Sequence, residues 1–177
     1  MKRCGTTVAL VALIVLAGCS TFPKPTSNTD TMLIIPVKKT NTFGERVREF
    51  QIRIHIVNLD DSSITKDVLT YLQKDWEFLT GLPEGHYRIV EIGLGTGGSG
   101  LKVNVEFALE ANKITILPYF LAITLSAANA AERTVQVAGG FLPLTAEMKK
   151  LIMDDLQGED NFHSWELSLS AATAGTT

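Results

Sequence analysis

The sequence lacks an excess of positive charge. Among its 177 residues, 16 are Lys or Arg and 19 are Asp or Glu, so the formal net charge is −3. No basic stripe appears along the chain either, and nucleic-acid binding depends on such charge to attract phosphates. We therefore expect no nucleic-acid partner. With 45% apolar and 20% charged residues, the composition is that of an ordinary globular domain.

Residue patterns that carry catalysis or bind metal are scarce. The three histidines, His55, His86 and His163, stand alone, without a ligand spacing such as H-x-x-H. No G-x-S-x-G occurs, and adjacent acidic pairs such as Asp60 and Asp61 lack the separation that glycoside hydrolysis needs. The sequence therefore predicts no catalytic residue, no cofactor and no metal site, and a protein that is not an enzyme.

A glycine-rich segment at residues 93–100 contains a G-x-G-x-x-G match. A dinucleotide site would need a helix next, because the amides at its N-terminus hold the pyrophosphate. Residues 101–109 instead alternate between apolar and polar side chains, as a strand does. We interpret the glycine-rich segment as a hairpin connection.

The first nineteen residues read as a targeting segment. Lys2 and Arg3 precede residues 8–17, an unbroken apolar run. This run has the length of a signal-peptide core, whereas a membrane span needs about 20 residues. It closes with Leu16-Ala17-Gly18-Cys19, which resembles the lipobox of bacterial lipoproteins.

The resemblance implies a signal peptide at residues 1–18 and a diacylglyceryl group on the sulfur of Cys19, with the membrane as a partner. Ser20 stands where family members retained at an inner membrane often carry Asp. The implied location is the cell envelope, at the outer membrane if the cell has one. An ordinary secretory signal or a buried apolar helix is the alternative. Cys4 would leave with the signal peptide, so no internal disulfide could form.

The segment after Cys19 is rich in Pro, Ser, Thr and Asn. Such a composition buries little apolar surface, so residues 19–31 are expected to be a lipidated N-terminus with a flexible tether. Residues 32–167 would then form the folded domain. Residues 168–177 are small and polar, which predicts a disordered tail.

Within the expected domain, apolar residues recur with a period of two, as at Ile52, Ile54 and Ile56. No helical period interrupts the strands before residue 139, and parallel pairs need long crossovers, so the sheets should be mainly antiparallel. The turn spacing is typical of an Ig-like β-sandwich. The expected strands are residues 33–37, 50–56, 68–72, 76–79, 87–92, 101–109, 114–125 and 134–137.

One segment carries a resemblance to a known fold. The strand from Trp76, the turn Leu82-Pro83-Glu84-Gly85 and the strand bearing Tyr87 resemble transthyretin-like (prealbumin-like) β-sandwich modules of bacterial surface proteins and lipoproteins. Pro83 presets φ for a turn, Gly85 can take a positive φ, and Leu82 and Tyr87 can turn inward. The resemblance implies an all-β, antiparallel sandwich, and no activity.

A C-terminal amphipathic helix is expected at residues 145–157. Thr145 can act as the N-cap, and Met148, Leu151, Ile152 and Leu156 recur at helical spacing before Gly158. Its apolar stripe should pack on an edge or end of the sandwich. After it, Phe162, Trp165 and Leu167 predict a last short strand or an apolar lid.

Residues 114–125 are the candidate interaction segment. Both faces of this expected strand are apolar from residue 116 to residue 123. Because Pro118 cannot donate to a ladder, the strand should lie at an edge or carry a bulge. Helix 145–157 is the expected cover. The alternative cover is an envelope protein, a second copy or the membrane surface, with Tyr119, Phe120 and Leu121 as candidate contacts.

These patterns favour a lipid-anchored cell-envelope protein whose β-sandwich is a non-catalytic binding or structural module. A carrier or chaperone of an apolar ligand is one alternative, which a large internal cavity would support. An envelope enzyme acting on glycan or peptide is the other, which polar residues converging in one deep pocket would support.

Overall fold

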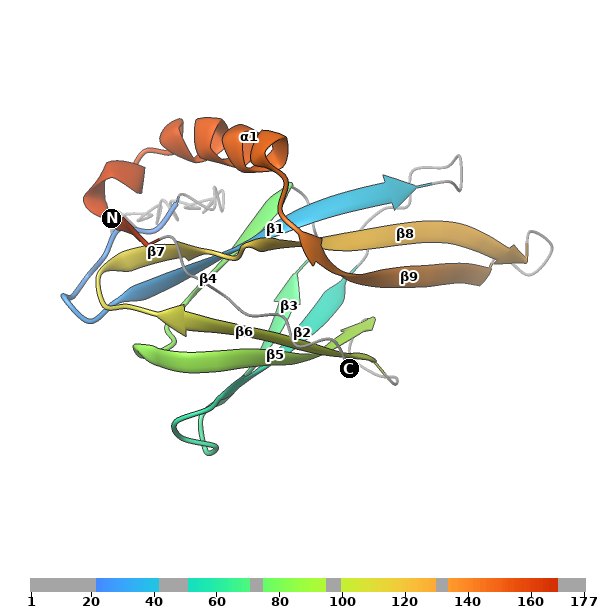
Figure 1. Ribbon diagram of the computed structural model, residues 1–177, viewed down its shortest axis with the longest axis horizontal. Helices are drawn as coiled ribbons and strands as arrows, with labels where there is room; N and C mark the ends of the chain where they lie inside the picture. The colour runs from blue at the N-terminus through green and yellow to red at the C-terminus, as the bar shows by residue number, and fades with distance from the viewer. Residues whose placement is uncertain (1–21, 42–50, 71–74, 95–99, 130–133, 169–177) are drawn as a thin grey trace, which may run out of the picture.

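The computed structural model describes residues 22–41, 51–70, 75–94, 100–129 and 134–168. Within these residues the chain is mostly β-strand, arranged in two sheets with one α-helix (Figure 1). The all-β expectation is therefore confirmed. The strands are β1 (Thr31–Asn41), β2 (Ile52–Asn58), β3 (Thr65–Thr70), β4 (Trp76–Thr80), β5 (Gly85–Leu94), β6 (Leu101–Leu109), β7 (Lys113–Ile116), β8 (Tyr119–Asn129), β9 (Thr134–Pro143) and β10 (Glu166–Ser168); the helices are α1 (Ala146–Gln157) and the 3-10 turn η1 (Phe162–Ser164).

The four-stranded sheet has the order β3-β2-β5-β6 and is antiparallel throughout. In β2, buried residues alternate with half-buried ones along the whole strand, which matches the period of two in the sequence. The pairing of Ile92 with Leu101 makes β5 and β6 a hairpin, so a strand follows the glycine-rich segment, as predicted. Residues 95–99 of that segment lie outside the described residues.

The six-stranded sheet is built around β1. β4 lies on one side of β1, and β7 and β8 lie on the other. Most pairings in the described residues are antiparallel, as expected, but β1 with β7, β1 with β8, and β10 with β7 are parallel. The long crossovers that parallel pairs need are supplied by the whole four-stranded sheet and by the segment from β8 to η1.

The expected strand at residues 114–125 is two strands, β7 and β8, separated at Leu117 and Pro118. The register with β1 shifts by two residues there, from Ile34 opposite Ile116 to Val37 opposite Leu121. Of the two alternatives predicted at Pro118, the shift in register agrees with a bulge, and the edge position is wrong. β8 pairs with both β1 and β9, and β7 pairs with both β1 and β10.

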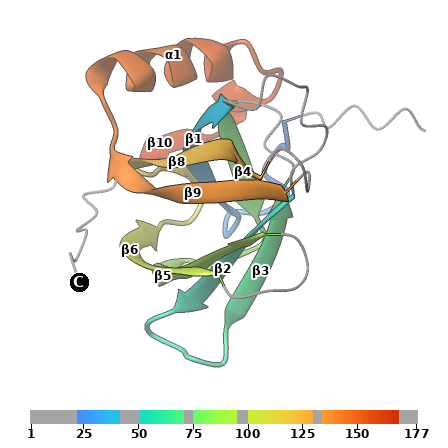
Figure 2. The same cartoon turned by 90° about the vertical axis from the view of Figure 1, so that its right-hand side faces the viewer.

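Two apolar cores lie on the two faces of the six-stranded sheet. The first core fills the space between the sheets (Figure 2). The second core lies between the six-stranded sheet and the layer of α1 and η1. The strand β1 serves both, because Leu33 and Ile35 belong to the first core and Met32 and Ile34 to the second. All four side chains are at most 1% exposed.

The helix α1 begins after Thr145, whose side-chain hydroxyl accepts the N–H of Met148 at 3.2 Å. It ends at Gly158, as the sequence predicted. Ile152 and Leu156 are buried against the sheet, but Leu151, expected on the same stripe, is 62% exposed. η1 and β10 follow, and Ser168, the first residue of the expected tail, ends β10.

The turn between β4 and β5 has the geometry expected of it. Gly85 has φ 148°, and Leu82 and Tyr87 are buried in the first core. The hydroxyl of Tyr87 donates to the carbonyl oxygen of Pro83 at 2.8 Å, a bond of the tyrosine-corner kind found in β-sandwiches. Gly81 also has a positive φ, 78°, which the sequence analysis did not anticipate.

Candidate functional site

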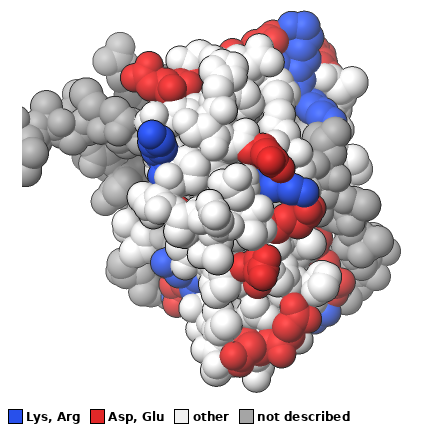
Figure 3. All heavy atoms as spheres, turned by 90° about the vertical axis from the view of Figure 1, so that its left-hand side faces the viewer, with Lys and Arg blue, Asp and Glu red and all other residues white. Residues whose placement is uncertain are grey.

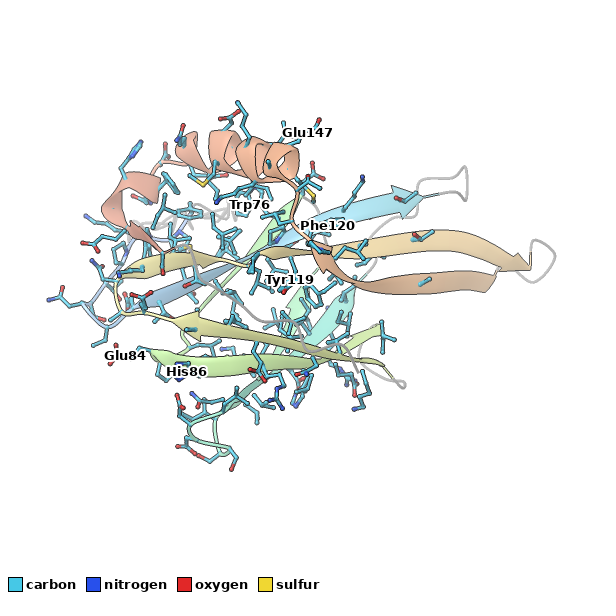
Figure 4. All side chains as sticks on the ribbon, in the orientation of Figure 1. Trp76, Glu84, His86, Tyr119, Phe120 and Glu147 are labelled. Carbon is cyan, nitrogen blue, oxygen red and sulfur yellow. The ribbon has the colours of Figure 1, made fainter. Side chains whose placement is uncertain are left out.

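The three candidate contact residues lie at the start of β8 and point to different faces. Leu121 is fully buried in the first core, and Tyr119 packs against the same core. Phe120 lies on the opposite face, toward α1, and is 8% exposed (Figure 4). Phe120 also lines a hollow in the described surface.

That hollow is a groove of about 770 Å³ between α1 and the six-stranded sheet, which we call the helix groove. Strands β1, β4 and β8 form one wall and α1 forms the other. Its floor is apolar, and charged side chains stand on both rims. The lining residues are Val37, Lys38, Lys39, Asp75, Trp76, Phe120, Thr145, Glu147, Met148, Leu151, Ile152 and Asp155.

One hydrogen bond fixes the width of the groove. The indole N–H of Trp76 on β4 donates to the carboxylate of Asp155 on α1 at 2.6 Å. A carboxylate in the last turn of a helix opposes the helix dipole, and the N–H of Trp76 offsets this cost. Asp154, its neighbour, pairs with Lys150 one turn earlier.

The lining of the helix groove suits an apolar or amphipathic molecule. Exposed Leu151 and half-buried Met148 offer apolar surface on α1, with lysines on the β1 rim and carboxylates on the α1 rim. Its lining includes no Ser, Cys or His. The hydroxyl of Thr145 is occupied as the helix cap.

A second, more open hollow of about 540 Å³ lies at the start of β5 and the end of β6, where Glu84 and His86 are seen (Figure 4). Three of its ionisable side chains, His86, Glu110 and Lys113, have partners. Hydrogen bonding to Lys113 is the main cause that lowers the pKa of Glu110. The backbone N–H of His86 is the main cause that lowers the pKa of Asp60, whose carboxylate also contacts the ring Nδ1.

The other two histidines do not line this hollow. Nδ1 of His55 on β2 is 2.8 Å from the carboxylate of Asp67 on β3, and His163 is exposed in η1. Within the described ranges, no group of three His, Cys, Asp or Glu side chains is placed to hold a metal ion.

The described part of the expected tether, residues 22–30, is docked rather than loose. Phe22 is 1% exposed and packs edge-on against Trp76, with ring centroids 6.1 Å apart. The indole N–H of Trp165 donates to the carbonyl oxygen of Pro23, and the side-chain amide of Asn161 to that of Phe22, both at 2.8 Å. The signal for this docking in the sequence is a lone aromatic residue, Phe22, in an otherwise polar segment.

The docked segment ends in a compact turn. The carboxylate of Asp30 accepts the backbone N–H groups of Thr26 and Ser27 and both their hydroxyls. These hydrogen bonds lower the pKa of Asp30 to about 2, and the bond from the Ser27 hydroxyl has the largest effect. The expectation of a flexible tether fails here because one buried aromatic and a capped turn supply the contacts that the composition did not indicate.

Cys19 and the rest of residues 1–21 lie outside the described residues. In the part of the chain that is described, no helix has the length and hydropathy needed to cross a bilayer. No known protein family, curated protein or solved structure matches the chain.

Proposed function

We propose that this chain is a lipid-anchored protein of the cell envelope, at the outer membrane if the cell has one, and that its folded part is a non-catalytic binding or structural module. The observation that carries the proposal is the sequence Leu16-Ala17-Gly18-Cys19 at the end of a short apolar run behind Lys2 and Arg3. A leader of this length and flanking charge suits a cleaved signal better than a membrane span.

For the fold, we propose a transthyretin-like or Ig-like β-sandwich that is mainly antiparallel, with α1 covering one outer face. Two sheets sharing the first core support this assignment. So do the positive φ of Gly85 and the hydrogen bond from Tyr87 to Pro83 at the turn that carries the resemblance.

Fatty-acid labelling in a bacterial host tests the anchor. The parent chain is expected to incorporate a labelled fatty acid and to sediment with membranes. Cys19→Ala should lose the label, because Cys19 is the acceptor that the motif provides. Cys4→Ala is the matched control and should keep the label, since Cys4 lies within the leader. A Cys19→Ala protein that still carries the label would contradict the proposal.

The helix groove favours one second candidate, a carrier of an apolar ligand. Its accessible apolar surface is mainly Leu151, which is 62% exposed, beside the half-buried Met148. Binding of the apolar dye anilinonaphthalene sulfonate, followed by energy transfer from tryptophan, tests this candidate. Leu151→Glu changes an exposed lining residue and should weaken dye binding. Leu59→Glu, at an exposed leucine away from the groove, should not. Equal binding by both variants would argue against the carrier.

A further inference from the structure

We propose that one end of the molecule, which we call the anchor end, is held against the lipid bilayer. It comprises η1, the docked segment 22–30 and the turn before β7. This inference rests on the proposed lipid anchor at Cys19. It goes further by naming the surface that meets the membrane and the surface that points away.

The docked segment is part of the folded body at this end. Trp165 and Asn161 both hold it through backbone carbonyls, at Pro23 and Phe22. The backbone N–H of Asn112 donates to the carbonyl oxygen of Asp30, and the N–H of Glu166 donates to that of Asn112, at 2.6 and 3.2 Å. The chain from Phe22 onward is therefore tied to η1, β7 and β10 and adds no slack to the anchor.

The reach of the anchor follows from covalent geometry. Phe22 is three residues after Cys19. A fully extended chain spans about 3.3–3.6 Å per residue, so the Cα atom of Cys19 lies within about 11 Å of that of Phe22. A flexible tether running to residue 31 would have allowed the folded domain to stand away from the bilayer and to reorient relative to it. Docking at Phe22 removes that freedom.

The opposite end then points away from the bilayer. The far ends of β8 and β9 lie across the molecule from η1 and the start of β1 (Figure 1). β8 has 11 residues, which at about 3.3 Å per residue extend about 35 Å. The outer part of this hairpin is therefore the surface presented to other envelope components.

Charge does not supply this orientation. The anchor end, seen in Figure 3, carries acidic side chains interspersed with basic ones and no continuous basic patch among the residues drawn in colour. Glu166 on β10, Asp160 before η1 and Lys24 in the docked segment are exposed. A surface of this kind is not attracted to anionic lipid. The orientation is therefore a consequence of the short covalent link and should be the same on neutral and anionic bilayers.

Quenching of a fluorescent label tests the orientation. Lipidated protein would be reconstituted in phosphatidylcholine vesicles containing a lipid with a nitroxide at its headgroup. A bimane label would be placed at Ser164→Cys in η1 or at Ala138→Cys in β9, both exposed positions. Acylation protects the sulfur of Cys19 from the label. We expect several-fold stronger quenching at position 164 than at position 138, unchanged when anionic lipid is added.

A linker variant gives the matched control. About 20 Gly and Ser residues inserted between Ser20 and Thr21 add a mean span of about 25 Å, so the difference between the two positions should shrink. Equal quenching in the parent protein, with the fatty-acid label present and the vesicles loaded, would overturn the orientation and leave the anchor intact. A difference seen only with anionic lipid would also overturn it. Failure of the parent protein to incorporate the labelled fatty acid would overturn both the lipid anchor and the orientation.

Discussion

The two apolar cores of this protein are made of different residues and of different stretches of chain. The first core is mostly aliphatic and is contributed by the alternating faces of β1, β2, β5, β6 and β8. The second core is rich in aromatic rings, and its members Phe22, Trp76, Phe162 and Trp165 come from both ends and the middle of the chain. Both cores share β1.

The difference shows two ways of closing a β-sheet protein. The first core needs side chains of similar size facing one another from two sheets, which alternation along the strands provides. The second core must fill an uneven space between a sheet, a helix and a loop. Large rings from separate segments fill that space, and their N–H groups bond to the segments they join, as Trp76 does to Asp155 and Trp165 to Pro23.

The largest effect is expected from a charge placed in the first core. Leu121 is fully buried there, so Leu121→Glu should cost more than about 4 kcal/mol and leave the chain unfolded. Circular dichroism and urea titration measure this. Leu121→Met is the control and should cost less than about 1.5 kcal/mol. A folded Leu121→Glu monomer that no longer associates would instead place Leu121 at a partner surface.

The first core could largely be predicted from the sequence, because apolar residues that recur with a period of two show which side chains face inward. This period does not show which strand pairs with which. Residues 33–37 were predicted as a strand, but neither its central place nor its parallel neighbours could be inferred from the sequence. Thr145 and Gly158 marked the helix correctly because capping is a local property.

The next effect should come from removing the ring that closes the second core. Phe22→Ala should lower the free energy of unfolding by about 3 kcal/mol, because it leaves a cavity among Trp76, Phe78 and Phe162. Both tryptophans of the chain lie in this core, so their emission should shift to longer wavelength. Amide exchange should rise more in α1 and η1 than in β2 and β5.

Lys24→Ala changes an exposed side chain of the same segment and is the control, expected to leave the urea midpoint unchanged. If Phe22→Ala also left the midpoint and the emission unchanged, the docked segment would not be part of the second core. The sequence could not predict this docking or the helix groove. Phe22 lies 54 residues from Trp76 and 140 from Phe162 along the chain, and no local period links them.

A smaller effect should follow from changing the turn that leads into the first core. Gly85 has φ 148°, and a Cβ there would meet the Asn58 side chain at 3.2 Å and that of Asp60 at 3.3 Å. Gly85→Val should therefore cost about 1–3 kcal/mol. Gly140→Ala is the matched control, since its φ is ordinary and nothing lies within 4 Å of its Cβ. Equal melting temperatures for both variants would contradict this account of the turn.

The smallest effect should be a loosening of the docked segment in acid. The pKa of Asp30 is lowered from 3.8 to about 2 because its ionised form accepts hydrogen bonds from Ser27 and Thr26. A lowered pKa means that the ionised form stabilises the turn, so this stabilisation is present above about pH 4 and is lost as the pH falls through about 2. The amide resonances of Thr26 and Ser27 would report the change. In the Asp30→Asn variant these amide resonances should show no such titration. This control distinguishes the titration of Asp30 from that of Asp60 and Glu110, whose pKa values are also lowered. Titration of the parent amides near pH 4 would mean that Asp30 does not hold the turn, and that Phe22 and Trp165 alone keep the segment docked.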